Sequence, residues 1–483
     1  MQIEKLRPER VFHFFSEIAQ IPRGSGNMQA ISEYCLRFAE ERGLKAHRDD
    51  YGNVMIFKNG TEGYEQSESV ILQGHLDMVC EKREDCSRDM EHEGVDVVID
   101  GEYIRANGTT LGGDNGIAVA YILALLDDPG IIPHPPIEAL LTADEEIGLR
   151  GAHALDTSEL TGRRLINMDS EAEGILTVSC AGAVRIACSL PIEREKTTAA
   201  MCARKLTVRG LLGGHSGIDI GKNRKNAAIV LAELLFDLNR HIHVSAAGFS
   251  AGGRLNVIPQ TAEMLICFDR ALEAEFDRLL AVYNAELKRA CSQTEPNAHI
   301  SAEDAPVPEK CLDKASNDAL ISALLLAPNG VSAISADIPF LVQTSSNLGS
   351  VSLGHGALNL GFMIRSNTDH GKGETLRRIR ALIEGAGGTI VLSDDYPAWE
   401  YRQNSPLRDA MVAAYAEMYG ENPQICAIHA GLECGILAEK LEGADMVSIG
   451  PNMQNVHTPD ERLNIKSVKR CWEYLLRVLE RLK

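Results

Sequence analysis

The segment Asn115–Asp128, NGIAVAYILALLDD, is apolar on nearly every face and is followed by Pro129. A helix with this pattern is buried rather than amphipathic. It lies between two short apolar segments, SVILQGHLDMV (69–79) and IEALLTADEE (137–146), which we interpret as strands. A strand, a buried helix and a second strand in this order predict a parallel crossover unit.

Further strands and helices extend this pattern in both directions. Residues 164–170, RLINMDS, form a third candidate strand. Residues 8–27 predict an amphipathic helix that ends near Pro22, and residues 28–44 predict a second helix closed by Gly43. The sequence therefore predicts an α/β fold: a mixed, largely parallel sheet covered by helices, with ligands bound at the carboxyl ends of the strands.

A change of character near residue 187 indicates a second domain. Residues 191–205, PIEREKTTAAMCARK, are polar and predict a linker. Beyond them strand patterns alternate with amphipathic helices, until the chain returns to the first domain. At 483 residues the chain exceeds what one core normally supports. We predict a catalytic domain of residues 1–186 and 390–483, and an inserted α/β lid domain of residues 187–389.

Composition and charge argue against several classes of partner. The chain has 48 Lys and Arg against 68 Asp and Glu, a formal net charge of −20. Nucleic acids and anionic membranes both require a positive surface, so neither is expected as a partner. The first residues lack the layout of a secretory signal, and the 12 cysteines include no CxxC pair. We therefore expect a cytoplasmic protein with reduced thiols.

His75 and Asp77 lie two residues apart in GHLDM (74–78), so on a strand both side chains point to one face. Asp77 can then hold one ring nitrogen of His75 and leave the other to bind a metal. Taken singly, a strand histidine is more often a packing residue. Asp114 in LGGDNGIA (111–118) likewise fits a simple helix cap.

The stretch TADEEIG (142–148) brings three carboxylates together at a predicted strand end. Buried like charges are costly unless a cation or a retained proton relieves them, although solvated turns also carry such runs. We predict that Glu146 is a metal ligand and Glu145 a general base. Adjacent strand residues point to opposite faces, so this assignment requires the strand to end at Asp144 or Glu145.

Two imidazoles and three carboxylates at predicted strand ends and in loops are enough for two divalent cations that share one carboxylate. Nitrogen and oxygen ligands without thiolate favour zinc, cobalt or manganese. Two such ions would clamp a water and polarise a substrate carbonyl. The predicted ligands are His75, Asp114, Glu146, Asp169 and His457.

Six motifs make the chain similar to the co-catalytic zinc peptidases that include carnosinases and acylase-type enzymes. In order they are GHLDMVCEK, LGGDNGIA, TADEEIG, NMDSE, GGHSGIDI and VHTP, and the resemblance covers essentially the whole chain. It implies one metal held by His75, Asp114 and Asp169. It implies a second metal held by Asp114, Glu146 and His457, with Asp77 orienting and Glu145 as the base.

The resemblance also implies a lid that contacts the substrate. His215 in GGHSG (213–217) would stabilise the oxyanion, either in its own chain or in the partner of a homodimer. A dipeptide needs a cation for its carboxylate and an anion for its ammonium. Arg365 and Asn256 are candidates for the carboxylate end, and Glu433 resembles the position that holds the amino end. Each of the three also has a purely structural explanation that is equally plausible: a surface ion pair for Arg365, a turn residue for Asn256 and a loop residue for Glu433.

These features predict a metallo-dipeptidase with a small dipeptide as substrate. The resemblance alone implies dipeptides of the Xaa-His type, including β-alanyl-histidine. One alternative is an N-acyl amino-acid amidohydrolase with the same two metals, which would not need Glu433. Another is a binding or scaffold protein with a vestigial site, although no ligand or base position is lost.

Overall fold

The computed structural model describes residues 3–483, which form two compact units. The first unit holds the residues up to Cys180 together with Tyr401–Ala427 and Leu432–Lys483. The second unit, Ala181–Glu400 with Ile428–Gly431, is inserted in the first. The boundaries expected from the sequence, at residues 187 and 389, fall inside one strand of the second unit and at the first residue of another.

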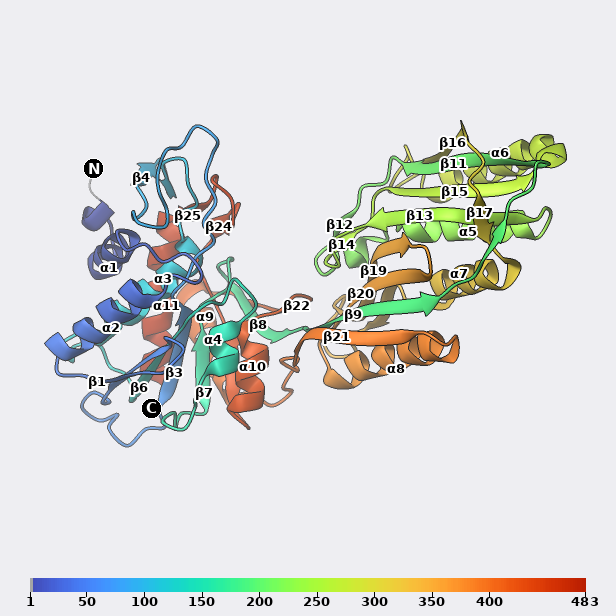
Figure 1. The fold of residues 1–483 in the computed structure, drawn as a ribbon. Helices are drawn as coiled ribbons and strands as arrows, with labels where there is room; N and C mark the ends of the chain where they lie inside the picture. Colours follow the sequence, from blue (N-terminus) through green and yellow to red (C-terminus); the bar gives the residue numbers. More distant parts are fainter. Residues whose placement is uncertain (1–2) are drawn as a thin grey trace. The chain divides into compact units, whose positions relative to one another are not determined.

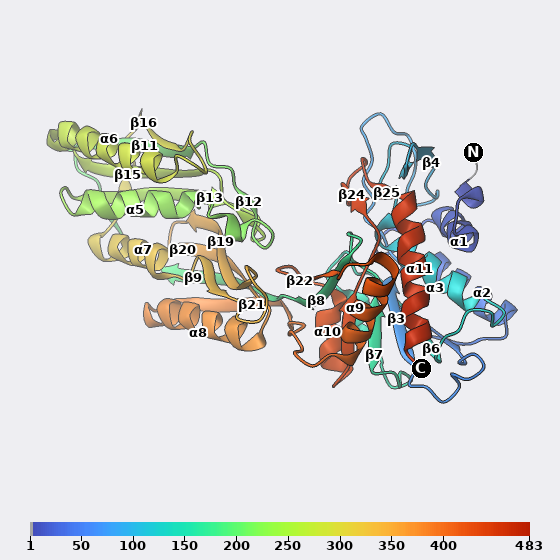
Figure 2. The same ribbon diagram turned by 180° about the vertical axis from the view of Figure 1, so that it is seen from behind.

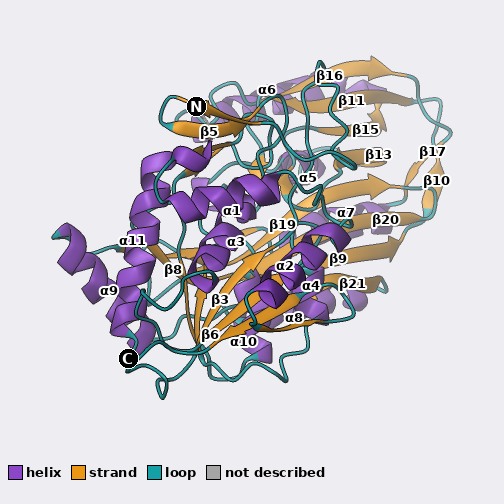
Figure 3. Cartoon of the chain, turned by 90° about the vertical axis from the view of Figure 1, so that its left-hand side faces the viewer, coloured by secondary structure: helices purple, strands orange, loops and turns teal. Residues whose placement is uncertain are grey.

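An eight-stranded sheet forms the centre of the first unit, in the order β1-β2-β6-β3-β7-β23-β8-β22. Its strands β6, β3, β7 and β23 are parallel, whereas the β1–β2 and β2–β6 pairs are antiparallel. This arrangement confirms the predicted mixed, largely parallel sheet, and Figure 3 shows β3 and β6 side by side. The strands are β1 (Lys45–Arg48), β2 (Val54–Lys58), β3 (Val70–His75), β6 (Ile137–Thr142), β7 (Arg164–Asn167), β8 (Ile175–Cys180), β22 (Gln424–Ile428) and β23 (Asp445–Ser448).

Helices cover this sheet on both faces, so every residue of β3 and β6 is buried. Helices α2 and α4 lie nearest the viewer in Figure 1, and α9 and α11 lie nearest the viewer in Figure 2. No helix within residues 3–483 combines the length and apolar character needed to cross a bilayer. The helices are η1 (Ile3–Lys5), α1 (Glu9–Ala19), α2 (Gln29–Glu41), α3 (Gly113–Leu126), α4 (Arg150–Ala154), α9 (Pro406–Tyr419), α10 (Glu433–Lys440) and α11 (Ile465–Arg481).

Helix α3 is the buried helix expected from the segment 115–128. Every residue of α3 except Asp114 is buried. The helix lies so close to β3 that a Cβ at Gly74 would stand 2.5 Å from Oδ1 of Asn115 and 2.7 Å from Cβ of Ala118. Only glycine permits this approach. It brings the amino end of α3 against the strand that ends at His75.

A small antiparallel sheet, β24-β25-β5-β4, joins two distant parts of the first unit. Strand β25 pairs with β5, which places the residues just after His457 beside the segment that leads into α3. Its strands are β4 (Val97–Asp100), β5 (Tyr103–Ala106), β24 (Met453–Gln454) and β25 (Arg462–Asn464).

The second unit is an α/β layer with an entirely antiparallel nine-stranded sheet. Figures 1 and 2 show its four long helices on one face of that sheet. The helices are α5 (Ala227–Asn239), α6 (Glu273–Ala290), α7 (Lys314–Leu326) and α8 (Asp369–Gly385), with η2 (Ile220–Lys222) and η3 (Arg270–Leu272) as short turns. The strands of the sheet are β9 (Gly182–Pro191), β11 (Met201–Arg209), β13 (Val244–Gly252), β15 (Ala262–Asp269), β16 (His299–Ala305), β18 (Gly330–Ile334), β19 (Val342–Leu353), β20 (Ala357–Ser366) and β21 (Thr389–Tyr396).

The predicted linker at residues 191–205 is wrong. Most of this segment is strand: β10 (Arg194–Lys196) pairs with β17 (Lys310–Leu312), and β11 begins at Met201. The small side chains of Cys202 and Ala203 are buried, next to the polar Arg204 and Lys205. Because the pairing partners lie about a hundred residues away, the local polarity of the segment concealed its place in the sheet. A further pair, β12 (Gly214–His215) with β14 (Val257–Ile258), forms a separate two-stranded sheet.

Candidate metal centre

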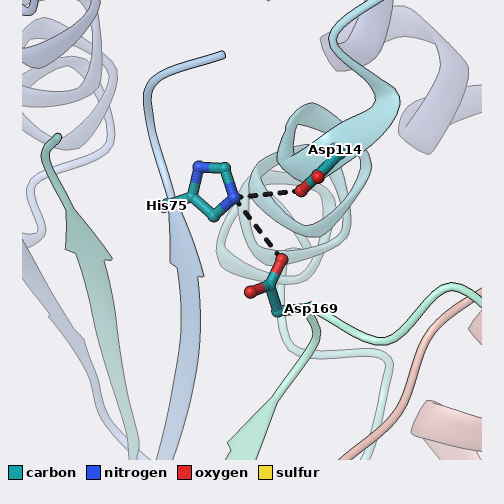
Figure 4. A group of neighbouring side chains, drawn as sticks. All are labelled: His75, Asp114 and Asp169. Atoms are coloured by element: carbon teal, nitrogen blue, oxygen red, sulfur yellow. Dashed lines mark hydrogen bonds and ion pairs between the residues drawn. The ribbon is translucent and has the colours of Figure 1, made fainter. Parts of the chain in front are cut away.

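His75 is the last residue of β3, and its ring is almost completely buried. Its Nε2 lies 3.0 Å from Oδ1 of Asp114 and 3.4 Å from Oδ1 of Asp169. Figure 4 shows both carboxylates directed at this one ring nitrogen. Asp169 follows β7, which pairs in parallel with β3, so the two strands present these side chains at the same edge of the sheet.

Asp114 stands between two histidines. Its Oδ1 faces His75, and its Oδ2 lies 3.0 Å from Nε2 of His457. The same nitrogen of His457 is 2.9 Å from Oε1 of Glu146. The five predicted ligands thus form two triads, each with ligand atoms within 4.8 Å of one another, that have Asp114 in common.

Asp77 connects the first triad to the carboxylate-rich turn. Its Oδ1 lies 3.3 Å from Nδ1 of His75 and accepts the backbone N–H of Glu145 at 2.9 Å. Its Oδ2 accepts the N–H of Glu146 at 3.2 Å and the hydroxyl of Ser25 at 2.8 Å. One buried carboxylate therefore holds a ligand side chain and the backbone of the turn that carries two more carboxylates.

The turn after β6 separates its three acidic side chains. The strand ends at Thr142, and Asp144 adopts a left-handed conformation with φ of 52°. Asp144 points away from the triads, because it accepts the N–H of Gly26 at 2.6 Å and the hydroxyl of Tyr51 at 3.0 Å. The chain has left the extended conformation before Glu145 and Glu146, which satisfies the condition that the sequence interpretation required.

Burial and crowding disturb proton binding throughout the centre. Burial raises the pKa of Glu145 well above its usual value and that of Asp169 to about 8. Burial opposes ionisation of Asp114 as well, but hydrogen bonds from His457 and His75 hold its pKa far below the ordinary value. Hydrogen bonds to Asp114 and Glu146 raise the pKa of His457 to about 11. Such shifts mark a cluster of negative charge that favours bound protons or cations.

The donor set fits divalent cations. Among residues 3–483, no lysine or arginine lies within ion-pair distance of Asp114, Asp169, Glu145 or Glu146, and the ion-pair partners of Asp114, Asp169 and Glu146 are histidines. Buried carboxylates without a basic partner are costly unless another positive charge compensates them. Imidazole nitrogen and carboxylate oxygen without thiolate are the ligands of catalytic zinc, cobalt or manganese sites.

A cavity of about 580 Å³ opens beside Glu146. Its wall includes Met78, Val79, Met90 and Ile147, and the loop around Gly24 forms another side. This volume is within the ordinary range of small-molecule sites, and its walls are mainly apolar. Ser25 of the same loop bonds to Asp77, so the cavity and the triads share structural elements.

Glu433 begins α10 and has no exposed surface. Its Oε2 accepts hydrogen bonds from Gln73 and Thr142, both at 2.6 Å, at the carboxyl ends of β3 and β6. Its Oε1 has no hydrogen-bond partner among the described residues. Burial raises the pKa of Glu433 to about 7.

The remaining predicted residues lie in the second unit. His215 ends β12 and pairs with Val257, so Asn256 adjoins it across that short ladder. The backbone N–H groups of Gly217 and Ile218 both donate to Nδ1 of His215 at 3.2 Å. Nδ1 is therefore an acceptor, and the neutral ring carries its proton on Nε2. Burial and then the charge of Arg365 lower the pKa of His215.

The guanidinium of Arg365 is buried and has no carboxylate partner among the described residues. Arg365 is only 5% exposed, and its Nε has no hydrogen-bond partner in the part of the chain that the structure describes. The guanidinium donates to the hydroxyl of Tyr396 at 3.4 Å and to Sδ of Met363 at 3.6 Å. No carboxylate among residues 3–483 lies within ion-pair distance of the Arg365 guanidinium. Leaving a buried guanidinium so poorly satisfied favours an anionic ligand.

Two buried residues of the first unit, Arg23 and Glu461, were missed by the sequence interpretation. Arg23 donates to backbone carbonyls beside both Asp77 and Asp114, and Glu461 accepts backbone N–H groups of the loop that carries Asp114. Arg23 follows Pro22 in a predicted loop, and Glu461 lies four residues after His457. Hydrogen bonds to a distant backbone leave no mark in a sequence pattern, so only the proximity of Glu461 to VHTP offered a signal.

Comparisons with known proteins identify the family of the chain and bear out its fold. The chain is 35% identical to the cytosol non-specific dipeptidase of Escherichia coli over 479 residues, 99% of each chain. It is also 35% identical to the aminoacylhistidine dipeptidase of Vibrio alginolyticus, whose crystal structure superposes with a TM-score of 0.95 over 99% of this chain and 98% of that one. The aminopeptidase PepT of Bacillus cereus shares the fold at 14% identity, with a TM-score of 0.58 over 99% of both chains. The model of peptidase family M20/M25/M40 matches residues 71–481, and the chain therefore belongs to this family of peptidases, hydrolases that act on peptide bonds.

Proposed function

We propose that the protein is a metal-dependent dipeptidase whose substrates include Xaa-His dipeptides such as β-alanyl-histidine. The observation that carries this proposal is the pair of ligand triads joined at Asp114, with Glu145 beside them. The names of the Escherichia coli and Vibrio alginolyticus relatives support dipeptides as the substrate class, and the second of these supports histidine as the second residue.

The five ligands would hold two divalent cations, with zinc as the preferred identity. His75 and Asp169 would bind one cation, Glu146 and His457 the other, and Asp114 both. When bound, such cations polarise the scissile carbonyl and make water a stronger acid. Asp77 keeps Nδ1 of His75 turned away from the ligand side, so that Nε2 faces the cation.

Glu145 is proposed as the general base. Its raised pKa makes the carboxylate a better proton acceptor than an exposed glutamate. A carboxylate oxygen of Glu145 takes a proton from the attacking water as the new carbon–oxygen bond forms. The same oxygen then gives the proton to the nitrogen of the leaving amine as the peptide bond breaks.

Substrate recognition is assigned to residues of both units. Nε2–H of His215 is the donor proposed for the oxyanion, which agrees with the acceptor role of its Nδ1. Arg365 would bind the substrate carboxylate together with Asn256, and the unpartnered oxygen of Glu433 would receive the ammonium. The cavity beside Glu146 has room for a side chain of the dipeptide.

The second unit would act as the lid over the substrate. A homodimer would allow His215 to serve either its own chain or its partner, and mixing an inactive H215A chain with an inactive E145Q chain tests the second arrangement by recovery of activity. A cytoplasmic location is supported by the word cytosol in the name of the Escherichia coli relative.

The decisive experiment measures free histidine released from β-alanyl-histidine by protein stripped of metal and then titrated with zinc. Activity that is absent in stripped protein and saturates near two zinc ions per chain is expected. Release of histidine without added metal would contradict the metal-dependent mechanism. Zinc binding without histidine release would limit the proposal to the metal centre, and N-acyl amino acids would be tested next.

A further inference from the structure

Glu461 binds the backbone around the shared ligand Asp114. The residue is 2% exposed and lies in the turn between His457 and β25. Its Oε2 accepts the N–H groups of Leu111 at 2.8 Å and Gly112 at 3.1 Å. Its Oε1 accepts those of Gly113 at 2.8 Å and Asp114 at 3.3 Å. One carboxylate therefore serves four consecutive backbone donors.

These donors lie in the turn that leads into α3, where Asp114 and Asn115 depart from the helical conformation, so their N–H groups have no partner within the helix. A carboxylate that accepts all four leaves none of these donors unpaired. Glu461 thus provides hydrogen-bond acceptors for the loop between β5 and α3. Without Glu461, this loop would have to fold beside the other carboxylates of the metal centre with these N–H groups unpaired. It also attaches that loop to the segment that supplies His457, a ligand of the same triad as Asp114.

Arg23 holds the other side of the same loop. It is 3% exposed, and its guanidinium donates to the carbonyl oxygens of Leu76 at 2.9 Å, Asp77 at 3.0 Å and Gly112 at 2.5 Å. The N–H of Gly112 is bound by Glu461 and its carbonyl by Arg23. A Cβ at Gly112 would stand 2.5 Å from the guanidinium, so this fit requires glycine.

We propose that Glu461 and Arg23 are positioning residues that hold Asp114 between the two histidines before any cation binds. Arg23 connects the loop of Asp114 to the end of β3, and Glu461 connects it to the segment of His457. The inference rests on the proposed metal centre, because it gives these residues the task of fixing a ligand that both cations share.

The test is the E461Q variant, titrated with zinc by calorimetry after metal removal. A glutamine has one acceptor oxygen, and its amide group would face backbone donors, so it cannot serve all four N–H groups. Zinc affinity should fall by about 10- to 100-fold at one or both sites, the range for lost outer contacts to metal ligands. Activity should return at raised zinc concentration, which a general loss of structure would not allow.

The matched control is D460N, on the neighbouring residue. The side chain of Asp460 is exposed and pairs with Arg83. This variant should bind two zinc ions with the affinity of the original protein. If E461Q binds both zinc ions with the affinity of the original protein, the proposed positioning role of Glu461 is wrong. If the original protein binds no zinc, the proposed metal centre itself fails, so the two failures are distinguishable.

A second measurement does not depend on the variant. Amide hydrogen exchange of the metal-free original protein should show residues 111–114 protected, because their N–H groups are bonded without any cation. Exchange as fast as that of the exposed turn at Gly101 and Glu102 would show that the loop is ordered only by metal. That result would overturn the inference even if E461Q does not fold.

Discussion

The carboxylate of Asp77 accepts the backbone N–H of Glu145 at 2.9 Å. The same oxygen lies 3.3 Å from Nδ1 of His75. One carboxylate oxygen therefore contacts both a metal ligand at the end of β3 and the turn of the proposed base after β6, and the backbone carbonyl of Asp77, 3.1 Å from Nδ1 of His75, adds a second contact to the ligand. Disturbing this carboxylate should affect metal binding and proton transfer together.

The D77N variant tests this coupling. An asparagine can present an NH₂ group to the turn, where Asp77 accepts two N–H groups, so at least one of these hydrogen bonds is lost. Zinc affinity should fall by about 10- to 100-fold, and kcat should remain lowered even at saturating zinc. S25A, which removes a single donor to the same carboxylate, is the control and should change both quantities far less. A D77N variant with unchanged kcat at saturating zinc would show that the hydrogen bonds of Asp77 to the turn are not needed to position Glu145.

Glu145 and Glu146 should behave differently although they are neighbours. E145Q should bind two zinc ions and lose about 10²- to 10⁴-fold in kcat, because a general base is removed and no triad ligand is changed. E146Q should weaken one zinc site instead, because Glu146 lies in the triad with His457. Zinc titration and steady-state kinetics on both variants check the assignment. A fully active E145Q enzyme would exclude Glu145 as the base.

Arg365 is expected to recognise the carboxylate of the substrate. R365M should raise KM and lower kcat/KM for a dipeptide by an amount equivalent to about 2 kcal/mol or more, since a buried charged partner is lost. The original enzyme should cleave the matching dipeptide amide poorly, and R365M should cleave it no worse. Equal losses by R365M on the free acid and the amide would contradict carboxylate binding.

Glu433 distinguishes the two hydrolase functions. E433Q keeps the shape of a fully buried side chain while removing its capacity for negative charge. The kcat/KM for dipeptides with a free amino group should fall by about tenfold or more, because a charge-assisted hydrogen bond is lost. N-acetylated dipeptides, tested in parallel, should show little change. A variant that loses both activities equally would assign Glu433 to the packing of β3 and β6 rather than to the ammonium.

The stability of the second unit should depend on His429. Ser345 lies 2.7 Å from its Nε2, and Oδ1 of Asn367 lies 3.1 Å from its Nδ1. Burial, followed by the charge of Arg365, lowers the pKa of His429 to about 3 from the ordinary 6.5. Between these values the unfolded chain binds the additional proton, so this contribution is present above pH 6.5 and is lost as the pH falls.

Urea denaturation at pH 7.5 and 5.5 measures this effect. Between the two values the original protein should lose about 1.4 kcal/mol more in free energy of unfolding than the H429Q variant, whose side chain does not titrate. Equal pH dependence in H429Q and the original protein would show that His429 is not held neutral.

The central crossover unit and the chemistry of the triads were both accessible from local patterns. The sequence predicted the buried helix because α3 carries apolar residues on nearly every face, and the short apolar runs of β3 and β6 flank it. Three of the residues proposed as ligands, His75, Glu146 and Asp169, lie at or just after the ends of β3, β6 and β7, and parallel strands bring their carboxyl ends to one edge. The same approach failed at residues 191–205, since β10 and β11 pair with partners far along the chain.

The sequence by itself determined which side chains are able to bind cations, since imidazole and carboxylate groups at strand ends carry that chemistry wherever they fold. The family resemblance of the sequence already implied that Asp114 serves the metals of both His75 and His457. Only the tertiary structure decided how the surrounding backbone is held: Asp77 on the turn of Glu145, and Glu461 on four N–H groups of a distant loop. Glu461 is separated from those donors by about 350 residues of chain. A hydrogen bond to a backbone group is independent of the side chain that the backbone carries, so such a contact arises from folding and has no local sequence pattern.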